Sequence, residues 1–116
     1  MTDKACFLLR IRPEHLPEYT RRHADLWPEM RAALDTAGYR NYSIFADESG
    51  LLVGYFEADD TARSAQRMAA HPVSTRWSED IGWMFVSMDG ARDTRDGHHW
   101  LQRVFDLDAT RSAVRS

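Results

Sequence analysis

The chain has 116 residues, of which 43% are hydrophobic and 28% are charged, a balance that excludes intrinsic disorder and predicts one folded domain. The formal net charge is -3 and the arginines are scattered among acidic residues, which argues against a nucleic-acid partner. The apolar run at residues 5–9 ends at Arg10 and is too short for a signal peptide or a membrane span, so we expect a cytoplasmic protein without a membrane partner.

The first predicted element is a strand over residues 4–12, which Pro13 ends. Its side chains alternate at the two-residue period of a strand with one buried face, formed by Ala5, Phe7, Leu9 and Ile11. Cys6 also lies in this strand and is the only cysteine, so no disulfide can form within the chain. We expect Cys6 to be a small buried side chain.

Residues 16–37 have the apolar spacing of a helix, which Pro17 opens in its first turn and Gly38 closes. Pro28 interrupts this pattern, because its ring removes one backbone donor and clashes with the preceding turn. We therefore expect a kink or a short break at Leu26 and Trp27.

Tyr19 and His23 are four residues apart, so both project from the same face of this helix. That face is otherwise apolar, which places an imidazole that titrates near neutral pH beside a phenol and toward the interior. Such a pair suits acid–base chemistry. A histidine on an apolar face is more often a packed, hydrogen-bonded core residue, so both interpretations remain open from these residues alone.

The remaining elements follow in chain order. Residues 40–46 and 51–58 form two strands of a hairpin whose short turn ends at Gly50. Asp59 or Asp60 caps a helix that begins near Thr61 and ends at His71, and a second helical segment covers residues 73–88. Residues 89–99 are predicted to be a loop, residues 100–107 a last strand and residues 108–116 a frayed tail, so the domain spans residues 1–107.

The predicted order of strand, helix, strand, strand, helix, strand is the split pattern of a ferredoxin-like α+β fold, with the helices on one face of the sheet. The other face also carries apolar side chains, which we assign to Cys6, Leu8, Phe45 and Phe56. Something must cover that surface. We expect a second copy of the chain, packed sheet against sheet as a homodimer.

Aromatic residues extend the candidate site beyond the helix. Tyr42 on the adjacent strand, Trp27 and Trp77 have polar tips, and together with Tyr19 and His23 they are able to line one cavity. Core filling is the simpler role for each tryptophan. An indole also offers a flat platform for the apolar face of a pyranose ring, which makes a small-molecule sugar a plausible ligand.

We expect neither a metal nor a cofactor. His15 and His23 share a helix face but lie eight residues, or about 12 Å, apart, too far for one zinc ion. The chain has no glycine-rich phosphate loop, nucleophile elbow, paired-cysteine motif or dinucleotide fingerprint.

Several motifs spread over residues 4–107 resemble one family. They are Tyr19-Thr-Arg-Arg-His23, Leu26-Trp27-Pro28-Glu29-Met30, Gly38, Asn41-Tyr42-Ser-Ile and Arg76-Trp77, and they are similar to those of the L-rhamnose mutarotases. The resemblance implies a dimeric α+β barrel of ferredoxin-like subunits that interconverts the α and β anomers of a free sugar without a metal or cofactor. It implies proton transfer by His23 and sugar contacts from Tyr19, Tyr42 and Trp77.

Ser78 departs from the family pattern, in which a second tryptophan commonly follows the one at position 77. We expect Ser78 to make one wall of the substrate pocket smaller and more polar. This difference bears on which sugar binds more than on which reaction occurs.

Two other functions compete with a mutarotase. A cofactor-free monooxygenase of the dimeric α+β barrel type would convert a quinol-like aromatic in an oxygen-dependent reaction, on an analogy of fold alone. A non-catalytic module that binds a small ligand or dimerises would use the same aromatic side chains only as structure. The sequence leaves open whether the loop at residues 89–99 closes over its own site or that of the partner.

Overall fold

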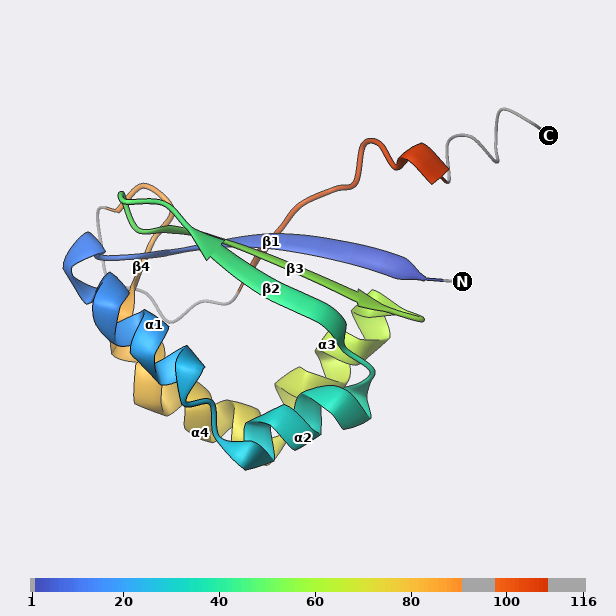
Figure 1. The fold of residues 1–116 in the computed structure, drawn as a ribbon, viewed down its shortest axis with the longest axis horizontal. Helices are drawn as coiled ribbons and strands as arrows, with labels where there is room; N and C mark the ends of the chain where they lie inside the picture. Colours follow the sequence, from blue (N-terminus) through green and yellow to red (C-terminus); the bar gives the residue numbers. More distant parts are fainter. Residues whose placement is uncertain (1, 91–97, 109–116) are drawn as a thin grey trace.

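The computed structural model describes residues 2–90 and 98–108. One antiparallel sheet lies over a layer of helices, all of which cover the same face (Figure 1). The strands are β1 (Asp3–Ile11), β2 (Arg40–Ala46), β3 (Leu51–Ala58), β4 (Phe85–Val86) and β5 (His99–Trp100). The α-helices are α1 (Leu16–Ala24), α2 (Pro28–Ala37), α3 (Thr61–Ala70) and α4 (Pro72–Ile81), with short 3-10 turns η1 (Pro13–His15) and η2 (Gly82–Met84).

The sheet has the strand order β2-β3-β1-β4, and β5 also pairs with β1. The two short strands share the same edge of β1, because β4 pairs with its end at Arg10 and Ile11 while β5 pairs with its middle at Phe7 and Leu8. This arrangement confirms the predicted ferredoxin-like α+β fold.

The predicted break before Pro28 is confirmed. α1 ends at Ala24, residues 25–27 are not helical, and α2 starts at Pro28, where the missing amide hydrogen does no harm. Gly38 ends α2 in the left-handed conformation, with φ of 100°, as the glycine after this helix predicts.

The prediction of a helix over residues 73–88 is wrong at its end. α4 stops at Ile81, and the chain continues through η2 into β4. The physical reason is tertiary pairing, because Phe85 and Val86 lie opposite Ile11 and Arg10 of β1. Met84 and Val86 are buried, whereas Trp83 is exposed, so the period changes from that of a helix to that of a strand.

The predicted last strand over residues 100–107 is also wrong beyond Trp100. One backbone hydrogen bond, from Leu101 N to Cys6 O at 2.9 Å, continues the pairing, and residues 101–106 then have no regular structure. This segment leaves the sheet and projects beyond it (Figure 1). Val104 is 90% exposed, so the side chains that suggest a strand have no neighbouring sheet to cover. Residues 91–97 of the expected loop and 109–116 of the expected tail lie outside the described residues.

The two faces of the sheet differ as the alternation of each strand requires. The helix-covered face buries Phe7, Ile11, Leu52 and Phe56, and Gly54 leaves room for the ring of Phe7, which lies where a β-carbon would be. Our assignment of Phe56 to the outer face is therefore wrong: Phe56 pairs with Ala5 in the strand register, is fully buried and points toward the helices.

The outer face does carry apolar side chains. Phe45, Val53 and Leu8 lie side by side across β2, β3 and β1, and Phe45 is 66% exposed. Cys6 belongs to the same face and is half-buried. Among the described helices, none combines the length and the apolar character needed to cross a bilayer. The cytoplasmic location stays a prediction.

Candidate active site

Helix α1 presents Tyr19 and His23 on one side, as their spacing predicts. Their rings lie 4.2 Å apart, measured between centroids, at an interplanar angle of 33°. Tyr19 is buried, whereas the imidazole of His23 is only partly buried. His23 is therefore within reach of a ligand and is not sealed into the core.

Among the described residues, one nitrogen of the imidazole has a hydrogen-bond partner and the other has none. Nδ1 lies 2.9 Å from the backbone oxygen of Tyr19. A carbonyl oxygen only accepts a hydrogen bond, so Nδ1 carries the proton in the neutral ring and Nε2 keeps its lone pair. Burial lowers the pKa of His23 below its ordinary value of 6.5, while the hydrogen bond to Tyr19 opposes this effect. A neutral imidazole with Nε2 free is the form required of a general base.

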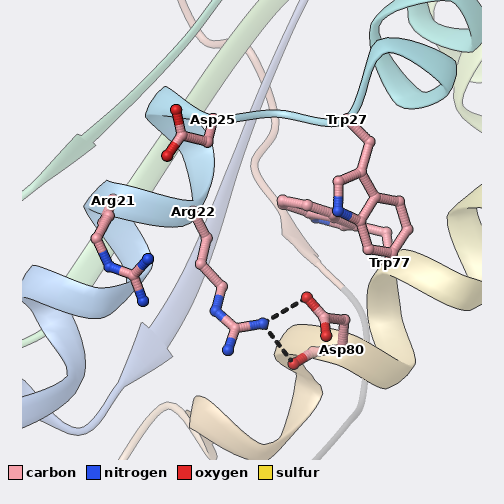
Figure 2. Close-up of a pocket in the computed structure, with 6 residues that line it drawn as sticks. All are labelled: Arg21, Arg22, Asp25, Trp27, Trp77 and Asp80. Carbon is pink, nitrogen blue, oxygen red and sulfur yellow. Dashed lines mark hydrogen bonds and ion pairs between the residues drawn. The ribbon is translucent and has the colours of Figure 1, made fainter.

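Trp77 reaches this pair from α4. Its ring lies 5.3 Å from that of His23, edge to face at 86°, and the ring of Trp27 also packs against it at 5.1 Å and 87°. Figure 2 shows both indoles together where the chain enters α2. The break before Pro28 places Trp27 at the N-cap of α2, beside α4.

A small pocket of about 190 Å³ adjoins these rings (Figure 2). Its walls are charged as well as aromatic, and its lining consists of Arg21, Arg22, Asp25, Trp27, Trp77 and Asp80. Trp77 belongs both to the pocket and to the contact with His23, which itself does not line the pocket. Within residues 2–90 and 98–108, no three His, Cys, Asp or Glu side chains group in a way that would hold a metal ion.

Tyr42 points from β2 into the layer between sheet and helices. Its ring lies 5.3 Å from Tyr39, 5.9 Å from Phe56 and 6.3 Å from Phe7. Burial, with a smaller effect of Tyr19 and Tyr39, raises the pKa of Tyr42, and burial also raises that of Tyr19. Both phenols therefore stay protonated at neutral pH and act as hydrogen-bond donors.

The hydroxyls of Tyr19 and Tyr42 are available to a ligand. Neither makes a hydrogen bond to another described residue. No side-chain oxygen or nitrogen in the described part of the chain is both fully buried and without a partner, so each of these hydroxyls keeps some access to solvent.

Ser78 lies apart from this group. It is exposed and lines a separate, larger groove between α3, α4 and β5, together with Thr75, Ala62 and Ala65. Adjacent helix residues point about 100° apart, which turns Trp77 toward α1 and Ser78 away from it. The structure brings together Tyr19, His23 and Trp77 but not Ser78.

The sequence analysis missed the charged wall of the small pocket, above all Arg22 and Asp80. A signal for Asp80 was present, because it follows Trp77 by three residues and so shares its side of α4. No local pattern indicates that Arg22 would face it, since the two residues are 58 positions apart.

Comparisons with known proteins identify the family of this chain. A family model described as L-rhamnose mutarotase matches residues 4–107. This chain belongs to the L-rhamnose mutarotase family. An L-rhamnose mutarotase of Enterococcus faecalis is 38% identical over 108 residues, which cover 90% of this chain and 98% of that relative.

Solved structures support the fold. An L-rhamnose mutarotase of Formosa agariphila superposes with a TM-score of 0.72 at 22% identity, over 90% of this chain and 98% of that one. A dimeric ferredoxin-like protein from an uncultured marine organism has a TM-score of 0.53 at 12% identity, over 92% and 98%. The ferredoxin-like subunit is thus shared with proteins of this mutarotase family and beyond it.

A pH titration should show a mutarotase whose activity falls only in acid. Because the pKa of His23 lies below 6.5, its imidazole is neutral at pH 7, and kcat/KM should decline as the pH falls through that lowered pKa. The free energy of unfolding should also decrease in acid. As the pH falls, His23 is protonated in the unfolded chain at a higher pH than in the folded one, so its contribution to the free energy of unfolding is present above pH 6.5 and is lost as the pH falls through the folded-state pKa.

The pKa is measured from the imidazole proton shifts by NMR, with the resonance assigned by its absence in His23→Gln. The same value should appear as the acid limb of the pH–rate profile. A folded-state pKa of 6.5 or above would contradict the prediction.

Proposed function

We propose that this protein interconverts the α and β anomers of free L-rhamnose, the reaction that gives its family its name. The observation that carries the proposal is the state of His23: Nδ1 is bound to the Tyr19 carbonyl, and Nε2 is free in a ring that stays partly exposed among aromatic side chains. Family membership supports the reaction type, and the phenols nearby supply donors for sugar oxygens.

In the proposed reaction, Nε2 of neutral His23 takes the proton of the anomeric hydroxyl. The bond between the anomeric carbon and the ring oxygen breaks, a solvent water molecule donates a proton to the ring oxygen, and an open-chain aldehyde forms. After rotation about the bond next to the aldehyde, the hydroxyl of the former ring oxygen attacks the other face of the carbonyl and gives its proton back to the solvent, while the imidazolium returns its proton to the aldehyde oxygen and the second anomer forms. Such acid–base catalysis contributes about 10²–10⁴-fold in rate.

The phenols take a different part. Because burial raises the pKa values of Tyr19 and Tyr42, these side chains stay protonated and donate hydrogen bonds to sugar oxygens. Trp77 offers its indole to the apolar face of the ring. A contact between the sugar and Ser78, and with it the choice of sugar, stays a prediction, since Ser78 lines the other groove.

The test is magnetisation exchange by proton NMR between the two anomeric signals of L-rhamnose at equilibrium. The protein should speed the exchange in proportion to its concentration, and a panel of aldoses and 6-deoxy sugars should rank its preference. Unchanged exchange across the whole panel would refute the mutarotase activity. A parallel assay of oxygen uptake with a quinol-like aromatic tests the monooxygenase alternative.

We also propose that the functional unit is a homodimer packed through the outer face of the sheet. Among the described residues, the row of Phe45, Val53 and Leu8 stays at least partly exposed in one copy, and the segment after β5 adds exposed apolar side chains at Val104 and Phe105. Large exposed apolar surfaces mark interaction sites. A second copy presents the same surface and is therefore the partner of matching chemistry.

Phe45→Glu should convert the dimer into a monomer, because it replaces an exposed aromatic side chain of the proposed interface with a charge. Sedimentation velocity measures the change. Thr36→Glu, an exposed position on α2 away from the sheet, is the control and should leave the dimer intact. A wild-type protein that sediments as a monomer would contradict the homodimer.

A further inference from the structure

Arg22 makes the ion pair that joins α1 to α4. Its Nε donates to Oε2 of Glu18, one turn earlier on α1, at 2.6 Å. Its Nη1 donates to the carboxylate of Asp80 on α4 and, at 3.3 Å, to the backbone oxygen of the same residue (Figure 2). Glu18 thus fixes the direction of the guanidinium, and Asp80 receives it across the gap between the helices.

This ion pair lies next to the contact between His23 and Trp77. Arg22 precedes His23 on α1, and Asp80 follows Trp77 by three residues on α4, so the two cross-helix contacts are neighbours on both helices. A single contact lets one helix pivot against the other, whereas two contacts fix the angle between them. The second contact matters here because residues 25–27 are not helical, so α2 does not continue α1 and does not fix its direction.

The arrangement adds little to global stability. The side chains of Arg22 and Glu18 are 28% exposed and that of Asp80 is 41% exposed, and ion pairs that are open to solvent in this way contribute little to folding stability. The reaction rate is more sensitive than stability to the position of His23, since a displacement of about 1 Å at a reacting group costs up to about 10²-fold in rate.

We propose that the Arg22–Asp80 ion pair is a positioning element that holds α1 against α4 and keeps the His23 ring against Trp77. The inference rests on the proposed function for the importance of His23, but the contact itself is a property of the fold. Arg22 and Asp80 act through His23, and neither takes part in the proton transfer.

Two conservative variants test the proposal. Arg22→Lys keeps the positive charge, but lysine lacks the planar guanidinium that bonds Glu18 and Asp80 at the same time. Asp80→Asn keeps the shape of the side chain but removes its negative charge. Arg40→Ala is the control, since it removes a pair of the same type, with Asp59, that contacts no helix of the site. The measurements are the NMR pKa of His23, kcat and KM for anomer exchange, and the midpoint of thermal unfolding.

If α1 loosens, His23 gains solvent and its pKa rises toward 6.5 in both variants. The direct effect of losing the Asp80 charge has the opposite sign, because a nearby carboxylate favours the imidazolium and its removal lowers the pKa. A rise in Asp80→Asn therefore separates positioning from simple electrostatics. We also expect kcat to fall about tenfold, with KM within about twofold of the wild-type value.

The double variant should be no slower than the slower single variant, because both changes remove the same contact. A lowered or unchanged pKa of His23 in Asp80→Asn, or wild-type kcat in both single variants, would overturn the proposal. If the wild-type protein itself fails to exchange anomers, the proposed function fails, while the pKa shifts still decide whether Arg22 and Asp80 position His23.

Discussion

His23→Gln should lower kcat/KM for anomer exchange by about 10²–10⁴-fold, the usual contribution of a general base. Glutamine keeps the size and polarity of the side chain but cannot take up a proton at neutral pH. The loss should appear mainly in kcat, because the proposed sugar contacts, Tyr19 and Trp77, remain in place. Magnetisation exchange at several sugar concentrations separates kcat from KM.

The matched control is His15→Gln. His15 lies in η1, before α1 begins, and its ring packs 4.8 Å from that of Trp83; among the described residues, no ring contact joins it to Tyr19, His23 or Trp77. Its replacement should leave exchange close to the wild-type rate. Equal activity of His23→Gln and the wild type would show that another group moves the proton.

Trp77→Ala should impair both folding and catalysis. Trp77 is only 7% exposed and packs against both His23 and Trp27, so truncation leaves a cavity and should cost about 3–5 kcal/mol of unfolding free energy. Loss of the edge-to-face contact also frees the imidazole of His23. We expect activity to fall by at least tenfold even below the melting temperature.

Denaturant unfolding and the exchange assay measure the two effects separately. Trp77→Phe keeps an aromatic edge and should recover most of the stability. Trp83→Ala is the control for losing an indole. Trp83 is 47% exposed and makes one hydrogen bond to the backbone oxygen of Asp80, so its removal should cost about 1 kcal/mol. A Trp77→Ala protein as stable as the wild type would contradict the packing described for α4.

Local signals in the sequence predict the elements that depend on local chemistry. Pro17, Pro28 and Gly38 mark the limits of α1 and α2 because each acts on its own turn of backbone. The four-residue spacing likewise places Tyr19 and His23 on one side of α1. These features need no knowledge of the rest of the chain.

Features that depend on distant partners are the ones the sequence does not predict. The strand at Phe85 and Val86 exists because β1 offers a free edge, and the side of the sheet that Phe56 faces depends on register with Ala5. The facing of Arg22 and Asp80 depends on how α1 packs on α4, which no local pattern describes. The family pattern predicts that Ser78 forms a pocket wall together with Trp77, whereas in one copy of the chain Ser78 lines the other groove, because adjacent helix residues point in different directions.

The hydrogen bond that orients the imidazole has an evolutionary consequence. Its acceptor is the main-chain oxygen of Tyr19, an atom that every amino acid supplies. Side-chain substitution at position 19 therefore removes a phenol but leaves the tautomer preference intact as long as the turn stays helical. The orientation of the His23 ring is thus insensitive to side-chain substitutions that would remove an orienting carboxylate. Side chains around His23 are therefore able to change, and substrate preference with them, while this orientation is kept.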